Sequence, residues 1–116
     1  MSQVQHLKTE TFENEVVRSS IPVLVDFYAT WCMPCRMLAP VIDKLAGELD
    51  GKVKVFKVNV DEDVGLAASY GIHAVPTLLL FAGGKVRERI EGLVAPKVLR
   101  EKLESLKVAP TPVAGA

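Results

Sequence analysis

Residues 23–29 (VLVDFYA) form a β-branched and aromatic run whose two faces are both largely apolar. A strand buries two such faces only in the middle of a sheet that helices cover on both sides. The run therefore predicts an α/β fold with this strand at its centre. The segment WCMPC (31–35) follows almost directly, so it is expected at the carboxyl end of the central strand.

The patterns on either side of this run predict the other elements of the fold. Helical spacing, acidic first turns and terminal glycine or proline predict helices near residues 11–17, 32–50, 61–70 and 96–106. Short polar or Val-rich and Leu-rich runs predict strands near residues 6–7, 52–60, 76–81 and 85–90. Gly83-Gly84 separates the last two strands and indicates a tight antiparallel hairpin to a more polar edge strand. The order β-α-β-α-β-α-β-β-α predicts a mixed sheet with helices on both faces.

Length and charge limit the organisation and the partners of the chain. Its 116 residues fit one domain, expected at 1–107, followed by a flexible tail at 108–116 (VAPTPVAGA). The 14 basic and 14 acidic residues cancel, which argues against nucleic acid or an anionic membrane as a partner. The polar start of the sequence lacks an apolar stretch of signal-peptide length, so a cytoplasmic protein is expected.

The two cysteines of the chain, Cys32 and Cys35, both lie in WCMPC, which also holds its single tryptophan. At the start of a helix, unpaired backbone N–H groups and the helix dipole would favour the thiolate of Cys32. Cys35 lies one turn further on the same side, where it can attack a mixed disulfide formed at Cys32. Pro34 should stiffen the turn between them, and Trp31 should shield one side. This arrangement predicts one attacking and one resolving thiol.

Two structural roles for the cysteine pair fit the sequence less well. A structural disulfide closing so short a loop would add only about 2 kcal/mol of stability. Half of a zinc site would need two further ligands, and neither His6 nor His73 belongs to a second paired motif.

Asp26 and Lys57 are charged residues inside otherwise apolar strands. Alternation places Asp26 on the same face as Leu24 and Tyr28, so burial should raise its pKa. A buried carboxyl group there could accept, directly or through water, the proton that Cys35 loses; a solvent-facing Asp is the alternative. Lys57 is either a partly buried counter-charge for Asp26 or a plain surface lysine.

The segments DFYATWCMPC and YGIHAVPTLLLFAGGKV, followed by Gly92, resemble the thioredoxin family over about residues 4–107. The resemblance implies the thioredoxin fold, a five-stranded mixed sheet flanked by four helices, and dithiol-disulfide exchange. It implies that Cys32 attacks, that Cys35 resolves, that Asp26 is the buried acid and that Lys57 is its partner.

The resemblance also implies a groove in which protein substrates dock. A cis peptide bond before Pro76 is implied, although X-Pro bonds in general are cis only about 5% of the time. The substrate-binding residues expected in the groove are Trp31, Met33, Pro34, Ala74, Val75, Pro76 and Gly92. Met33, Tyr28 and Ala74 depart from the commonest family pattern, and Met33 is expected to tighten docking onto apolar partners and to alter the reduction potential.

The resulting hypothesis is a monomeric, general protein disulfide reductase with no bound cofactor and no metal. The resemblance suggests electrons from NADPH through a flavin-dependent thioredoxin reductase. It also suggests disulfide-containing substrates of the ribonucleotide reductase, peroxiredoxin and methionine sulfoxide reductase types. The alternatives are a disulfide oxidase or isomerase of the same fold, and a structural subunit of a larger complex.

Overall fold

The computed structural model describes residues 4–107, so the tail predicted at 108–116 lies outside the described residues. The strands are β1 (Gln5–His6), β2 (Val23–Tyr28), β3 (Lys54–Asn59), β4 (Thr77–Ala82) and β5 (Lys85–Glu91). The helices are α1 (Thr9–Phe12), which continues as the π-helical turn η1 (Glu13–Val17), α2 (Met33–Glu48), α3 (Val64–Ser69) and α4 (Pro96–Lys107). This order of elements confirms the predicted α/β architecture.

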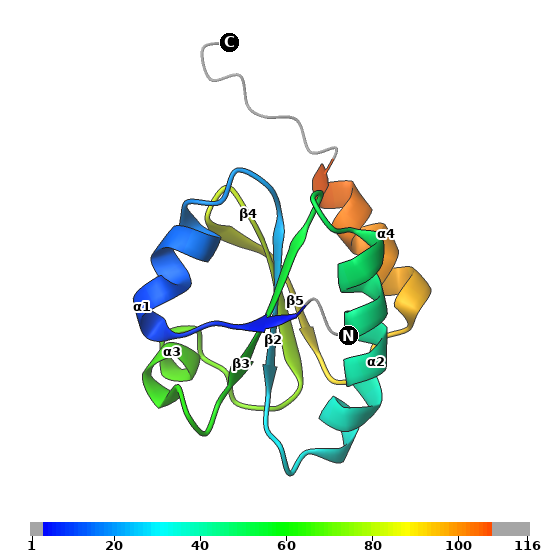
Figure 1. Ribbon diagram of the computed structural model, residues 1–116. Coiled ribbons are helices and arrows are strands. Elements are labelled where there is room, and N and C mark those ends of the chain that lie inside the picture. The colour runs from blue at the N-terminus through cyan, green and yellow to red at the C-terminus, as the bar shows by residue number, and fades with distance from the viewer. Residues whose placement is uncertain (1–3, 108–116) are drawn as a thin grey trace.

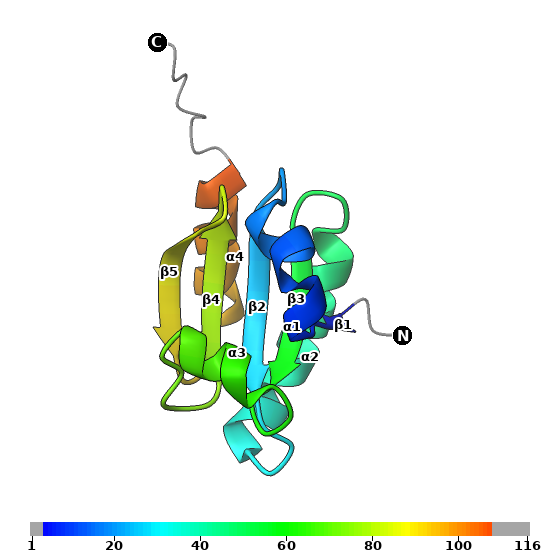
Figure 2. The same ribbon diagram turned by 90° about the vertical axis from the view of Figure 1, so that its left-hand side faces the viewer.

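The strands form one mixed sheet in the order β1-β3-β2-β4-β5. β1, β3 and β2 run parallel, whereas β4 is antiparallel to both β2 and β5. Helices α1 and α3 cover one face of the sheet, and α2 and α4 cover the other (Figures 1 and 2). Among the described helices, none combines the length and the apolar character needed to cross a membrane.

Alternate residues of β2 belong to two different parts of the core. Leu24 packs in a cluster with residues of α2 and α4, including Leu38 and Leu99. Val25 and Phe27 pack in a second cluster with side chains from the α1 side of the sheet. Because both faces of β2 are buried, the prediction of a central strand is confirmed.

The hairpin between β4 and β5 is formed by Gly83 and Gly84. Their φ angles are +63° and +79°, as a two-residue turn of type I′ requires. A Cβ atom on Gly84 would lie 2.6 Å from the carbonyl oxygen of Val17, so the hairpin also packs closely on the end of η1.

Two helix starts differ from the prediction because side chains fold back on the preceding turn. The first helix starts at Thr9 rather than near Thr11, whose hydroxyl group accepts a hydrogen bond from the backbone N–H of Lys8 at 3.3 Å. α3 starts at Val64 rather than near residue 61. There the side chain of Asn59 accepts a hydrogen bond from the N–H of Asp61 at 2.9 Å, forming a turn before the helix.

Candidate active site

The cysteine pair lies where β2 passes into α2, at the lower edge of the view in Figure 1. Cys32 is the N-cap of α2 and is joined to Cys35 by a disulfide bond, with their Cα atoms 5.2 Å apart. The backbone N–H of Cys35 donates a hydrogen bond to Sγ of Cys32 at 3.2 Å. Negative charge on this sulfur in the reduced protein would meet the unpaired N–H groups and positive dipole of the helix start.

The loop before β4 lies against the sulfur of Cys32. The carbonyl oxygen of Val75 is 3.6 Å from this Sγ, and the Val75-Pro76 peptide bond is cis, as the family resemblance implied. The N–H of Gly92 donates to the carbonyl oxygen of Pro76 at 2.9 Å. Apart from its two chain neighbours, no atom of residues 4–107 lies within 4 Å of where a Cβ of Gly92 would stand. The structure therefore brings Cys32, Val75, Pro76 and Gly92 together, with open space beside the glycine.

Exposed apolar side chains flank Cys32 in the sequence. Trp31 and Met33 are 68% and 62% exposed, and Pro34 is also exposed, in the first turn of α2. Trp31 and Ala74 line a hollow of about 180 Å³ beside the loop.

Asp61 is a residue of this region that the sequence analysis missed. Its Oδ2 accepts a hydrogen bond from the indole N–H of Trp31 at 2.8 Å, which fixes the ring. β3 runs parallel to β2, so residues that follow β3 emerge at the same edge of the sheet as WCMPC. That parallel pairing was the signal that could have identified Asp61.

A pocket of about 320 Å³, here called the Asp26 pocket, lies behind the disulfide. Its ionisable and sulfur-bearing lining residues are Asp26, Tyr28, Cys35, Arg36 and Lys57. Cys35 lines this pocket, whereas Cys32 does not, so the two sulfurs have different surroundings. Arg36 is a further residue that the sequence analysis missed; its Nε donates to the carbonyl oxygen of Thr30 at 3.1 Å.

Asp26 is 5% exposed, which confirms the predicted burial. Among the buried side-chain polar atoms of residues 4–107, its Oδ1 is without a hydrogen-bond partner. Burial raises the pKa of Asp26 from 3.8 to about 7, and the positive charge of Lys57 opposes this rise. Asp26 can therefore both take up and release a proton near neutral pH.

Lys57 stands in register beside Asp26 but is only half-buried. None of the ion pairs found within the described part of the chain joins the two side chains. Instead, Nζ of Lys57 lies over the ring of Tyr28, 5.7 Å from the ring centroid. Lys57 therefore acts on Asp26 through its electric field rather than through a direct ion pair.

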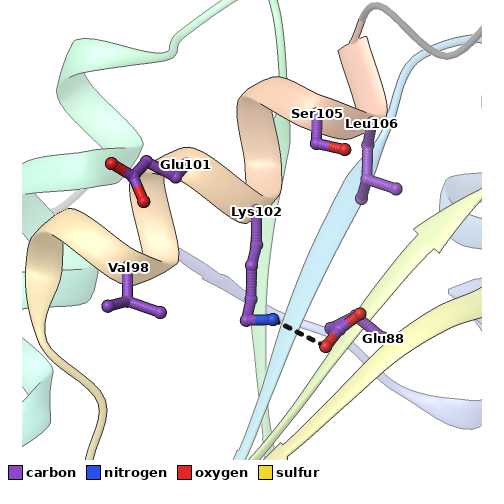
Figure 3. A pocket seen from close by; sticks show the side chains of 6 residues that line it. All are labelled: Glu88, Val98, Glu101, Lys102, Ser105 and Leu106. Atoms are coloured by element: carbon purple, nitrogen blue, oxygen red, sulfur yellow. Dashed lines mark hydrogen bonds and ion pairs between the residues drawn. The ribbon is translucent and has the colours of Figure 1, made fainter.

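Another pocket, between β5 and α4, is lined by neither Asp26 nor Lys57. It holds an ion pair in which Lys102 donates to Glu88 at 2.8 Å, and it is lined by neither cysteine (Figure 3). The Asp26 pocket, in contrast, is lined by both a buried acid and a sulfur of the cysteine pair.

Comparisons with known proteins agree with this geometry. The family model for thioredoxin matches residues 3–105. The chain is 47% identical over 104 residues to thioredoxin 1 of Nostoc sp., covering 90% of this chain and 97% of the relative. It is 44% identical over 104 residues to a thioredoxin of Synechocystis sp., again covering 90% of this chain and 97% of the relative. It is 48% identical over 95 residues to a chloroplastic M-type thioredoxin of Chlamydomonas reinhardtii, covering 82% of this chain and 68% of the relative. With nearly its whole length matched and the cysteine pair in place, the chain belongs to the thioredoxin family and is a protein-disulfide reductase.

Proposed function

We propose that the protein is a general electron donor that keeps cytoplasmic protein thiols reduced, with Cys32 as the attacking and Cys35 as the resolving thiol. The observation that carries this division of roles is that the two sulfurs have different surroundings. Sγ of Cys32 lies beneath the Val75 loop, where a substrate would dock, whereas Cys35 lines the Asp26 pocket.

The reaction consists of two exchange steps. The thiolate of Cys32 attacks one sulfur of the target disulfide, which forms a mixed disulfide and releases the first target thiol. Cys35 then loses its proton to Asp26 and attacks Sγ of Cys32, which forms the Cys32–Cys35 disulfide and releases the second target thiol. Two electrons thus pass from the cysteine pair to the target, and the pocket between Cys35 and Asp26 has room for a water molecule to relay the proton.

Recognition of the substrate is assigned to the groove around the Val75 loop. An extended segment would pair with the backbone of Ala74 and Val75, while Trp31, Met33, Pro34 and Pro76 supply apolar contacts. The open space beside Gly92 would admit the neighbouring part of the segment. Backbone pairing depends little on substrate sequence, so a broad range of disulfide proteins is expected.

The oxidised pair has to be reduced again by another protein. A flavin-dependent thioredoxin reductase that draws on NADPH is the proposed electron source, and ribonucleotide reductase, peroxiredoxin and methionine sulfoxide reductase are the proposed types of target. The cytoplasm is the proposed compartment, since a redox-active pair without further cysteines suits a reducing environment. Thioredoxins named as chloroplastic are among the relatives, so a chloroplast location is the alternative.

A redox titration of the cysteine pair against glutathione tests this function. Thioredoxins themselves define the reducing reference at about −270 mV, and protein disulfide isomerase lies at about −180 mV. These values are benchmarks and do not follow from the geometry. A value near the first benchmark is expected, together with turnover when NADPH and a thioredoxin reductase are added. A value near or above the second would identify an oxidase or isomerase instead.

Truncation of Met33 is expected to weaken docking of apolar partners without slowing the chemistry. Met33 is 62% exposed beside Cys32, so Met33→Ala should raise the KM for a protein disulfide with apolar flanks about fivefold, or ~1 kcal/mol, at unchanged kcat. Steady-state kinetics measure both constants. Val86→Ala is the matched control, because Val86 is 41% exposed but lies next to the hairpin at the opposite end of the sheet. Equal KM values for the two variants would contradict the docking role.

A further inference from the structure

Three ionisable side chains stand in one row across three neighbouring strands. His6 of β1 pairs with Lys57 of β3, and Lys57 pairs with Asp26 of β2. Residues paired in register project from the same face of a sheet. The row therefore runs from the sheet edge, where His6 is exposed, to the buried carboxyl group of Asp26.

Tyr28 contacts two members of this row. It lies two residues beyond Asp26 on the same face of β2, and Nζ of Lys57 is 5.7 Å from the centroid of its ring. The ring of His6 meets the Tyr28 ring edge-on, with centroids 6.0 Å apart and an interplanar angle of 68°. We call Tyr28 and His6 the aromatic shelf.

The ammonium group of Lys57 lies over the Tyr28 ring of the aromatic shelf. None of the ion pairs among residues 4–107 includes Lys57, so the Tyr28 ring takes the place of a carboxylate partner. Lysine carries its charge on a flexible four-carbon stem, which leaves many alternative positions open. An aromatic face attracts a cation placed over it, which favours one of these positions over the others.

We propose that the aromatic shelf positions Lys57 for the resolving step: the Tyr28 ring holds Nζ at the wall of the Asp26 pocket, and His6 supports the ring from the sheet edge. The proposal rests on the proposed role of Asp26 as the base. Without the shelf, the lysine side chain turns toward solvent and its charge acts less on Asp26.

The charges around the aromatic shelf influence the protonation state of His6. The titratable and charged groups that face it are Lys57, Asp26, Glu62, Lys8 and, across the pocket on α2, Arg36. Burial lowers the pKa of His6, as does the neighbouring charge of Lys57, while Glu62 opposes them. His6 is therefore uncharged at neutral pH, and its support of Tyr28 is an aromatic contact rather than an ionic one.

The test is an NMR titration of the carboxyl carbon of Asp26 in the oxidised protein, in which the cysteines do not titrate. Lys57→Met gives the shift in the Asp26 pKa when the ammonium group is absent. Tyr28→Leu is expected to raise the pKa of Asp26 by about half a unit. Tyr28→Phe keeps the aromatic face and should leave it unchanged. His6→Ala should raise the pKa of Asp26 by a smaller amount. His6→Phe should leave that pKa at the parent value, because phenylalanine supplies an aromatic edge without a charge.

A double variant separates positioning from a direct effect of Tyr28 on the burial of Asp26. In the Lys57→Met background, Tyr28→Leu should cause no further shift. A full additional shift there, or no shift from Tyr28→Leu and His6→Ala in the parent, would overturn the proposal. His6 is exposed at the edge, so its variants keep the test available if Tyr28→Leu does not fold.

The single-turnover rate of mixed-disulfide resolution distinguishes this proposal from the function on which it rests. Across the same variants, the pH midpoint of that rate should follow the measured Asp26 pKa. If the carboxyl titration moves as expected while the midpoint stays fixed, the aromatic shelf does position Lys57 beside Asp26, but the role of Asp26 as base fails and with it the link to resolution. If the midpoint follows the titration in Lys57→Met but neither moves in Tyr28→Leu, the shelf fails and the base remains.

Discussion

Replacing Cys35 with serine is expected to turn the protein from a catalyst into a covalent trap for its substrates. Cys32 keeps its position at the amino end of α2, beneath the Val75 loop, so attack on a target disulfide still occurs. A serine hydroxyl cannot displace the bound thiol, so the reaction stops at the mixed disulfide. Mass spectrometry of the intact protein after incubation with a disulfide substrate should show one adduct per chain, which an added dithiol releases.

Cys32→Ser is expected to abolish the reaction before any adduct forms. The variant lacks the sulfur at the helix start, and the remaining thiol lies one turn further along α2, facing the Asp26 pocket. The rate of protein disulfide reduction should fall by about 10³-fold or more, as for loss of a nucleophile in other enzymes. The assay is reduction of a protein disulfide followed under the same conditions for parent and variant.

The double variant Cys32→Ser, Cys35→Ser is the control for both experiments. It should give neither turnover nor adduct while keeping the fold, because the rest of the core does not depend on the pair. Equal adduct formation by the two single variants would contradict the assigned order of attack. Full cellular function of the double variant would instead support a structural subunit whose thiols are incidental.

The order of elements could be predicted from the sequence because each strand and helix carries its own signal. Residues 23–29 are apolar on both faces, and Gly83-Gly84 occupies a turn in which both φ angles are positive. The starts of α1 and α3 could not be placed as well. They depend on where the side chains of Thr11 and Asn59 find backbone partners, and such local hydrogen bonds compete with regular helix geometry.

The residues of the candidate site whose chemistry follows from residue type and spacing could be predicted from the sequence. The contacts that depend on how distant segments pack together could not. Cys32, Cys35 and the buried Asp26 follow from one motif and from strand alternation. The bond between Trp31 and Asp61 and the position of Lys57 over Tyr28 depend on which strands are neighbours and which rotamers pack. The cis bond before Pro76 was implied by family resemblance alone, because the general preference of X-Pro bonds favours trans.

Replacing Asp26 with asparagine is expected to stabilise the folded protein increasingly as the pH rises from 4 to 7. Burial raises the pKa of Asp26 from 3.8 to about 7, so well below pH 3.8 the carboxyl group is protonated in both the folded and the unfolded chain. Between these values the unfolded chain releases the proton and the folded chain keeps it, which lowers the free energy of unfolding of the parent. The loss levels off above pH 7, at roughly 4 kcal/mol.

Chemical denaturation of the oxidised protein at a series of pH values measures this difference. The gap between Asp26→Asn and the parent should widen by roughly 4 kcal/mol up to pH 7 and then stay constant. Asp50→Asn, which changes an exposed carboxylate at the other end of α2, should alter stability by less than about 0.5 kcal/mol. Because the asparagine cannot accept the proton of Cys35, Asp26→Asn should also slow resolution about 10²-fold while leaving attack by Cys32 intact. A gap that does not change with pH would show that Asp26 ionises as readily in the folded chain as in the unfolded one, and the buried carboxyl group would then have no special capacity to hold a proton at neutral pH.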